Sequence, residues 1–333
     1  MKYTIILLIL LVSCSKETNT TKNGQLKGRA FGTYYYIKTT DDKDIEHLRQ
    51  PIEELIDSIN DSMSTYQKSS LISKLNRSKK AVVDDMFLEV IKKSRIIHEK
   101  TNGYFDPTAG LLVNYYGFGS DTQQDQKGNL DSLREYVNLD LLEISGDTLI
   151  KKYKRMYVDL NSIAKGYAVD QFVKLLKSKG LDNFLVDIGG EVYAKGNKPN
   201  GKQWKIGINE PIKNEDTSKR KLSAKVGLKN KAMATSGNYL KYKIDKKNNR
   251  ETVHTINPLS GKAKPSSVLS ASVIMDDCMS ADAYATAMMA MGHEKAIKFI
   301  EKESLFEGYL IYRGKDGKIN TYVTNGFKEI LED

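Results

Sequence analysis

The sequence predicts an α+β protein in which mixed, largely antiparallel sheets pack against helices. Short aromatic and β-branched segments recur along the chain, and amphipathic or apolar segments with helical spacing lie between them. The helical segments are placed irregularly and do not follow every strand, which argues against a regularly wound parallel sheet. A chain of 333 residues can bury one large core or form two intimate lobes.

The first half of the folded region predicts a strand followed by two helices. The aromatic segment from Leu26 to Thr39 is expected to form one strand. Apolar residues at helical spacing predict an amphipathic helix from Ile45 to Ser64. A second helix is expected to start at Asp84-Asp85 and to stop at Gly103, and Met156-Tyr157-Val158 is expected to end a strand.

The second half predicts several more strands and helices. Ala164 to Lys179 is expected to form a helix that Gly180 closes. Two further helices are expected at Ser280–Met291 and Lys295–Glu303. The expected strands are Phe184–Asp187, Trp204–Ile208, Leu222–Val226, Ser267–Met275, Tyr309–Tyr312 and Asn320–Val323.

The N-terminal segment predicts export and lipid attachment. Lys2 precedes an unbroken apolar run from Ile5 to Val12, which is too short to span a bilayer but suits a signal peptide. The run ends in Leu11-Val12-Ser13-Cys14, which resembles the lipobox of bacterial lipoproteins, where the cysteine is acylated and the peptide is cut before it. The alternative is an ordinary signal peptide with an incidental cysteine.

These features divide the chain into three parts. We expect a signal peptide over residues 1–13, a polar, lipid-anchored tether over residues 14–25, and one folded region over residues 26–333. The protein would then be an exported lipoprotein, held to a membrane by Cys14, with its body in the periplasm.

The composition argues against several classes of function. The net charge of +10 comes from dispersed lysines without interleaved aromatic residues, so we expect no nucleic-acid partner. Cys278 would be the one free cysteine of a lipidated chain, so no internal disulfide is expected. The four histidines have no zinc-ligand spacing, and the glycine-rich segments match neither a dinucleotide-binding fingerprint nor a P-loop.

Two segments combine aromatic or basic side chains with a carboxylate. Thr101 to Thr108 presents Tyr104, Phe105 and Asp106, which would suit either a flat ring or a simple helix end and turn. Asp159 to Tyr167 brings a carboxylate and Lys165 to a helix start, where a pyrophosphate could bind. The alternative is a helix cap with a solvated lysine.

Two further segments carry candidate metal and proton-transfer groups. Asp282 and Thr286 are four residues apart on a helix, so their oxygens share one face and suit magnesium, although a helix-end aspartate needs no metal. His254 lies where a strand gives way to a turn rich in Pro and Gly, and it is either a general base or a strand-end histidine.

The order of these segments resembles that of the FAD:protein FMN transferases, the ApbE family of flavin-transferring lipoproteins. The resemblance covers essentially the whole chain after the tether. The matching segments are Phe31–Thr33, Met63–Tyr66, Gly103–Thr108, Leu112–Asn114, Gly117–Gly119, Val158–Leu160, Ile163–Asp170, Val186–Glu191, Ala234–Tyr239, His254–Gly261 and Asp282–Thr286.

The resemblance implies an ApbE-like fold and a set of site residues. The residues that it implies for FAD binding are Phe31, Tyr66, Tyr104, Phe105, Asp106, Asp159, Lys165 and Ile256. Those implied for magnesium are Asp282, Thr286 and Ser162, the last through its backbone carbonyl.

The implied reaction is magnesium-dependent transfer of FMN from FAD to a Thr or Ser hydroxyl of an acceptor flavoprotein, with release of AMP. The acceptor would carry a Ser/Thr-Gly-Ala-Thr-like motif and serve exported electron-transport complexes. Asp282 would act through the metal, and His254 is our candidate for accepting the hydroxyl proton. Two alternatives stay open: a magnesium-dependent FAD pyrophosphatase that yields FMN and AMP, and a non-enzymatic FAD-binding lipoprotein. Asp282 and Thr286 count against the second, since a carrier needs no phosphate-bound metal.

Overall fold

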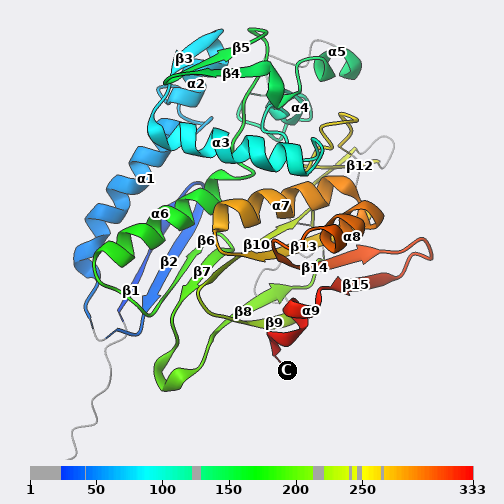
Figure 1. Cartoon of the computed structure of the whole chain (residues 1–333). Coiled ribbons are helices and arrows are strands. Elements are labelled where there is room, and N and C mark those ends of the chain that lie inside the picture. Colours follow the sequence, from blue (N-terminus) through cyan, green and yellow to red (C-terminus); the bar gives the residue numbers. More distant parts are fainter. Residues whose placement is uncertain are drawn as a thin grey trace, which may run out of the picture.

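The centre of the fold is an eight-stranded sheet in which every neighbouring pair of strands is antiparallel (Figure 1). In spatial order its strands are β1 (Gln25–Ala30), β2 (Thr33–Thr39), β6 (Phe184–Ile188), β7 (Glu191–Lys195), β10 (Lys231–Gly237), β13 (Val268–Met275), β14 (Glu307–Arg313) and β15 (Ile319–Val323).

This computed structural model describes residues 24–41, 43–121, 129–212, 221–239, 242–245, 250–263 and 266–332. The predicted signal peptide, Cys14 and most of the predicted tether lie outside these residues. None of the helices in the described ranges is long and apolar enough to cross a bilayer.

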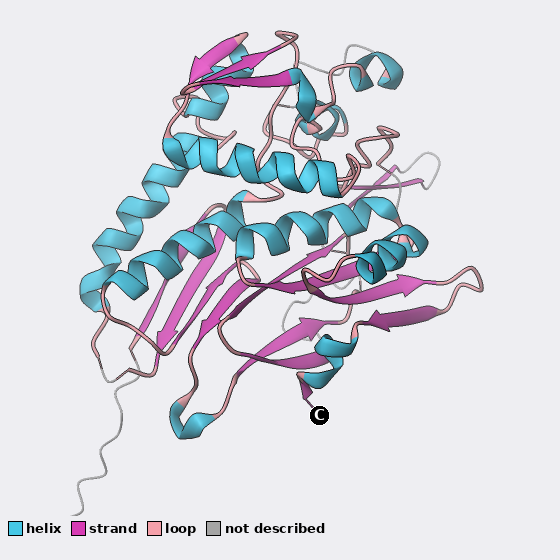
Figure 2. Cartoon of the chain, in the orientation of Figure 1, coloured by secondary structure: helices cyan, strands magenta, loops and turns pink. Residues whose placement is uncertain are grey.

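Helices cover one face of the large sheet, and two smaller groups of strands complete the molecule (Figures 1 and 2). The helices on this side are α1 (Arg49–Met63), α3 (Asp85–Lys100), α6 (Ala164–Ser178), α7 (Cys278–Met291) and α8 (His293–Lys302). Beyond α3 lies a small sheet of β3 (Lys80–Val82), β5 (Thr148–Lys151) and β4 (Leu142–Ser145), with α2 (Leu71–Arg77), α4 (Gly110–Tyr115) and α5 (Leu130–Arg134) nearby.

The opposite face of the large sheet is covered by β16 (Leu331–Glu332), β9 (Leu222–Leu228), β8 (Trp204–Asn209) and α9 (Asn325–Glu329). A separate antiparallel pair, β11 (Tyr242–Asp245) and β12 (Arg250–Val253), lies near the end of α7 (Figure 1).

Strand residues alternate between two apolar layers, as the two-residue period of a strand requires. In β10, Ala232 and Ala234 belong to the core under the helices, whereas Met233 belongs to the core under β8 and β9. The helix-side core continues without a break into the small sheet through Leu142 and Leu149. The two parts therefore share one core, and the predicted α+β class with largely antiparallel sheets is confirmed.

Local sequence explains where the helices begin and end. Asp84 caps α3, because its Oδ1 atom accepts a hydrogen bond from the backbone N–H of Phe87 at 2.8 Å. Asn102 and Gly103 follow α3 with φ angles of 48° and 78°, so Gly103 stops the helix as predicted. In contrast, α6 starts after Ile163 without a side-chain cap.

Two predicted strands differ from the structure. The segment from Leu26 to Thr39 forms a hairpin and not one strand, because Phe31 and Gly32 adopt φ angles of 52° and 74° and turn the chain. Met156-Tyr157-Val158 does not end a strand. Its strand-type pairing is a single bridge between Ala109 and Tyr157, and the side chain of Asn76 bonds both backbone groups of Val158. The apolar side chains of the segment pack into the core instead.

Candidate active site

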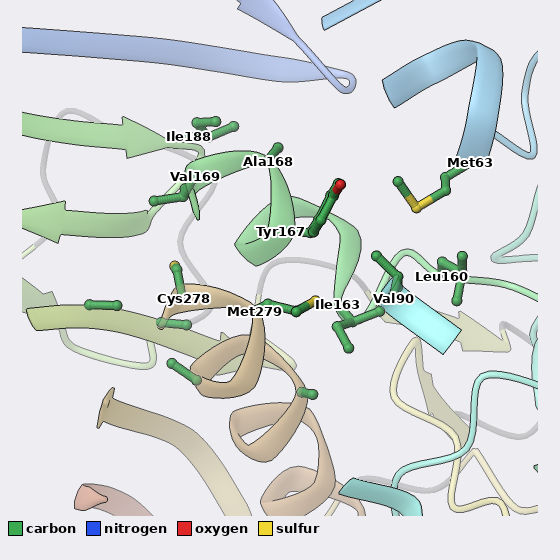
Figure 3. Close-up of a cluster of buried hydrophobic side chains, with 14 of the residues drawn as sticks. Met63, Val90, Leu160, Ile163, Tyr167, Ala168, Val169, Ile188, Cys278 and Met279 are labelled. Atoms are coloured by element: carbon green, nitrogen blue, oxygen red, sulfur yellow. The ribbon is translucent and has the colours of Figure 1, made fainter. Parts of the chain in front are cut away.

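The first turns of α6 and α7 touch at a glycine. A Cβ atom on Gly166 would lie 2.3 Å from the carbonyl oxygen of Cys278, so only glycine allows this approach. Figure 3 shows the apolar cluster around the contact, in which Ala168 and Val169 of α6 lie with Cys278 and Met279 of α7. The contact brings the uncapped start of α6 beside the first half of α7.

Asp282 points from α7 at the start of α6. Its side chain is buried, and its Oδ2 atom accepts a hydrogen bond from the backbone N–H of Gly166 at 3.1 Å. Burial raises the pKa of Asp282, and the charge of Lys165 and this hydrogen bond oppose the rise. One turn further along α7, the Oγ1 atom of Thr286 lies 3.2 Å from the Oγ atom of Ser236 on β10.

Lys165, which is half-buried, forms an ion pair with the buried Glu191 beside Asp282. The Nζ atom of Lys165 lies 2.6 Å from Oε1 of Glu191, whose side chain is buried. Burial raises the pKa of Glu191 to about 7. Burial also acts to lower the pKa of Lys165, but the carboxylates of Glu191 and Asp282 raise it on balance. When all three groups are ionised, two carboxylates face one ammonium, so the cluster carries an excess negative charge.

Glu191 is the member of this cluster that our sequence analysis missed as a site residue. It begins β7 directly after Gly189 and Gly190, whose φ angles of 62° and 105° make the tight turn that returns the chain. The sequence did carry a sign of this role, because Glu191 is an acidic residue that follows two glycines at the end of an apolar strand. Its Oε2 atom is buried and has no hydrogen-bond partner among the described residues.

The hairpin turn at Phe31 lies beside this glycine turn. The backbone N–H of Gly189 donates to the carbonyl oxygen of Tyr34 at 3.1 Å, and a Cβ atom on Gly189 would lie 2.6 Å from Cγ2 of Thr33. Phe31 is partly buried against the helix-side core, and it therefore lies at the same end of the strands as Glu191.

Asp159 and Ser162 belong to the turn that leads into α6. The Oδ1 atom of Asp159 accepts a hydrogen bond from the backbone N–H of Asn161 at 2.8 Å, which holds the turn. Tyr66 is 67% exposed. The pKa of its hydroxyl is raised, mainly by partial burial of the hydroxyl and to a smaller extent by the negative charge of Asp159. Tyr66 therefore offers an open aromatic face close to Asp159.

The segment from Tyr104 to Asp106 is more buried than an open aromatic platform would be. Phe105 is 1% exposed and lies in the core, whereas Tyr104 is half-buried with Nζ of Lys295 located 5.1 Å from its ring centre. The Oδ1 atom of Asp106 accepts hydrogen bonds from the backbone N–H and the hydroxyl of Thr108 at 2.8 and 2.6 Å. Its Oδ2 atom accepts one from the backbone N–H of Leu139 at 3.1 Å.

The carboxylate of Asp106 thus holds two segments of the chain together. Burial raises its pKa. Asp106 also lines a cleft of about 730 Å³ with His98, Asn102, Pro258 and Leu259, and this cleft does not reach Lys165 or Asp282.

His254 and Ile256 lie on the loop that follows β12. The side chain of Asn257 ties this loop to α7, because its Nδ2 atom donates to the carbonyl oxygen of Ala290 at 2.9 Å. Ile256 is buried with Leu111, and the ring of His254 meets that of Phe118 edge-on at 6.5 Å. The loop is therefore fixed at the far end of the helix that carries Asp282 and Thr286.

The structure brings the predicted site residues together to different degrees. An ion pair joins Lys165 to Glu191, and Asp282 bonds to the neighbouring Gly166 and interacts with the charge of Lys165. The turn with Asp159 and Ser162 leads into this group. His254 lies apart from that group in the fold, on the loop that Asn257 ties to the end of α7. Within the described ranges, no three His, Cys, Asp or Glu side chains gather in the manner of a metal cluster.

Known proteins share this fold and sequence. The ApbE family model matches residues 31–310. An FAD:protein FMN transferase of Haemophilus influenzae is 32% identical over 343 residues, which covers 98% of this chain and 96% of the relative. One of Vibrio cholerae is 33% identical and covers 97% and 96%. The structure titled flavin transferase ApbE from Vibrio cholerae superposes with a TM-score of 0.81 at 32% identity and covers 93% of this chain and 99% of that one.

The chain shares the fold of the flavin transferase structure, and its relatives are transferases over nearly their full length, so it is an enzyme of the transferase class. The match spans well over half of the chain and nearly the full length of the relatives. The chain belongs to the ApbE family.

Proposed function

We propose that this protein transfers FMN from FAD to a Thr or Ser hydroxyl of an acceptor flavoprotein, with release of AMP and with a requirement for magnesium. The observation that carries the proposal is the meeting of Lys165, Glu191 and Asp282 at the uncapped start of α6. The positive end of a helix dipole and a lysine beside it attract phosphate. The names of the relatives identify the flavin donor and the class of acceptor.

The pyrophosphate of FAD would lie at the start of α6, where Lys165 adds positive charge. Tyr66 supports this placement, because its exposed ring lies close to Asp159 and can stack against a flat ring. The remaining proposed FAD contacts are Phe31, Tyr104, Phe105, Asp106 and Ile256. Phe105 and Asp106 are buried, so they would act through their backbone and through the shape of the turn.

The donor set near Asp282 fits magnesium. Its proposed ligands are the carboxylate of Asp282, the hydroxyl of Thr286 and the backbone carbonyl of Ser162, all hard oxygen atoms of the kind that Mg²⁺ prefers. The unpartnered Oε2 atom of Glu191, buried beside Lys165, also supports a cation there. Bound magnesium would neutralise negative charge on the phosphates.

The proposed transfer is a displacement at phosphorus. The oxygen of the acceptor hydroxyl attacks the phosphorus that bears the riboflavin half, and the bond from this phosphorus to the oxygen shared with AMP breaks. AMP leaves with the bonding electron pair, and the hydroxyl proton passes to a base, for which His254 is our candidate. Lys165 would stabilise charge on the phosphates during this step.

One incubation tests the proposal against its two alternatives. Purified protein is mixed with FAD, magnesium and an unmodified flavoprotein domain carrying a Ser/Thr-Gly-Ala-Thr motif, and the products are analysed by intact mass. A gain of the FMN mass on the acceptor is expected. Free FMN with AMP would indicate the pyrophosphatase, and FAD that stays intact and bound would indicate the carrier.

We also propose that the protein is exported and anchored through lipidated Cys14, with its body in the periplasm. The apolar run from Ile5 to Val12 and the cysteine at its end support this location. A lipid anchor would keep the enzyme near membrane-bound acceptors of exported electron-transport complexes.

A further inference from the structure

A second cleft opens at the end of α7 that leads into α8. Its volume is about 810 Å³, within the range of ligand-binding clefts. It lies among the ends of β10, β12 and β13 and the hairpin of β14 and β15, on the side of the molecule where Figure 1 shows α8. Its lining includes Ile212, Asn238, Val253, Ser267, His293 and Ile319.

Asn238 gives this cleft an unsatisfied polar group. The side chain is 8% exposed, yet neither its Oδ1 nor its Nδ2 atom has a hydrogen-bond partner among the described residues. A buried amide left in this state is costly, so most such groups in folded proteins have partners. The amide therefore suits a ligand that presents a donor and an acceptor side by side.

Asn238 is the first residue after β10 and lies two positions beyond Ser236. Ala232 and Ala234 belong to the helix-side core, so the two-residue period places Ser236 on the helix side of the sheet. Ser236 contacts Thr286 at 3.2 Å. Two residues of chain span at most about 7 Å, so Asn238 lies close to Ser236 and, through it, to a candidate magnesium ligand.

The same cleft borders the candidate proton acceptor. Val253 lines the cleft, and His254 is the next residue. The lining of the cleft thus comes within one residue of His254 and within two residues of Ser236, which contacts Thr286. A group held in the cleft would lie near the place where an acceptor hydroxyl must react.

Apolar side chains at the cleft are exposed to solvent. Ile212 is 54% exposed and Ile319 is 57% exposed, although aliphatic side chains of this size gain free energy on burial. Because both side chains line the same cleft, they give it apolar contact surface beside the amide of Asn238.

We propose that this cleft binds an extended segment of the acceptor polypeptide next to the hydroxyl that is modified. The amide of Asn238 pairs with a backbone peptide group of that segment, which offers one N–H and one C=O. Ile212 and Ile319 contact its apolar side chains. The inference rests on the proposed transferase function and assigns the surface that recognises the protein substrate.

The test compares cleft variants with a matched control in the full chain. The variants are Asn238→Leu, which keeps the size of the side chain without its hydrogen bonds, and Ile319→Lys. The control is Leu305→Lys, because Leu305 is 51% exposed and does not line the cleft. The acceptor is the same unmodified flavoprotein domain, and the melting temperature of each variant is measured first.

We expect each cleft variant to raise the KM for the acceptor about tenfold, with kcat at saturating acceptor and the Kd for FAD within about twofold of the wild type. The control should match the wild type in all three values. An unchanged acceptor KM in folded Ile319→Lys and Asn238→Leu would overturn the docking inference while leaving the transferase intact. A rise in the Kd for FAD alone would assign the cleft to FAD and would also overturn it.

A second measurement does not depend on turnover. A photo-crosslinking p-benzoylphenylalanine replaces Ile319 or, as the control, Leu305, and the acceptor is added with FAD absent. Crosslinking at position 319 and not at 305 is expected, and equal crosslinking at the two positions would count against the cleft. If the wild type attaches no FMN to the acceptor in the activity assay, the proposed function itself fails, and that result is distinct from a failure of the cleft variants.

Discussion

The Nζ atom of Lys165 lies 2.6 Å from Oε1 of Glu191, two residues that are far apart in the sequence and meet where β7 begins beneath the start of α6. Asp282 adds a second buried carboxylate to the same group. This arrangement depends on mutual charge compensation, which makes the three side chains interdependent.

Replacing Lys165 should therefore destabilise the fold. Lys165→Met leaves two buried carboxylates without a cation, and we expect the free energy of unfolding to fall by about 3–5 kcal/mol at neutral pH. Lys165→Met combined with Glu191→Gln should lose less than Lys165→Met alone, since one of the uncompensated charges is gone. Urea unfolding without ligand measures both. Strictly additive losses would show that the two residues do not interact.

Asp282→Ala should abolish most transfer activity. The variant lacks the one carboxylate among the proposed magnesium ligands, and we expect the rate of FMN transfer to fall about 100-fold or more while FAD binding falls less. Asp282→Asn provides a second test, because it can still accept a hydrogen bond from Gly166. Asp276→Ala is the control, since that side chain is 86% exposed and lies just before α7. Wild-type transfer by a well-folded Asp282→Ala protein would remove Asp282 from the metal site.

Truncation of Tyr66 should weaken FAD binding, whereas truncation of Phe105 should lower the stability of the fold. Tyr66→Ala should weaken FAD binding by about 0.5–1.5 kcal/mol and leave stability nearly unchanged, because the ring is 67% exposed. Phe105→Ala should lower the free energy of unfolding by about 3–5 kcal/mol, because the ring is 1% exposed in the core. Calorimetric titration with FAD and thermal unfolding separate the effects, with Tyr153→Ala as an exposed aromatic control. Unchanged FAD affinity in Tyr66→Ala would exclude stacking at that position.

We expect the contribution of Asp170 to the stability of the fold to decrease as the pH rises. Its carboxylate accepts hydrogen bonds from the backbone N–H groups of Cys278 and Met279 at the start of α7, at 2.8 and 2.9 Å. Burial raises its pKa to about 7 from the usual 3.8, so the folded state binds more protons than the unfolded state between these values. Its contribution is therefore complete below pH 4 and is lost as the pH rises through 7.

The size of this effect is at most about 4 kcal/mol, from the pKa difference alone. Thermal unfolding from pH 4 to pH 8 should show a smaller decline for Asp170→Asn than for the wild type. Parallel pH profiles for the two proteins would rule out Asp170 as a source of the dependence.

Cys14→Ser should release the protein from the membrane without unfolding its body. Acyl chains contribute about 0.8 kcal/mol for each buried methylene, so loss of the acylated thiol removes the anchor. Detergent-phase partitioning of the variant and the wild type measures this, and FAD binding serves as the control for folding. Equal partitioning of the two proteins would contradict lipidation at Cys14.

Much of the fold could be predicted because its determinants are local. The helical spacing of apolar residues placed α1, α6 and α7 close to their observed bounds, and Asp84 and Gly103 marked the start and stop of α3. The hairpin at Phe31 was missed, because a turn with positive φ at a phenylalanine has no clear sign in the residue types. Short elements such as α2, β3 and α9 were missed for a similar reason, since a few residues show too little periodicity.

The candidate site was predicted in part. The segments around Lys165 and Asp282 contained charged residues at helix starts, which is a local pattern. Glu191 was missed as their partner, and the burial of Phe105 was not predicted, because ion pairing and burial depend on which distant segments come into contact.

The α+β class, the positions of the long helices, the family and the residues that can carry charge all follow from the order of the amino acids. The pairing of Glu191 with Lys165, the link from Asp106 to Leu139 and the place of Asn238 in the lining of a cleft appear only in the folded chain. The reason is physical: capping and periodicity act within a few residues, whereas charge compensation, burial and cleft formation arise from contacts between segments that the chain brings together only on folding.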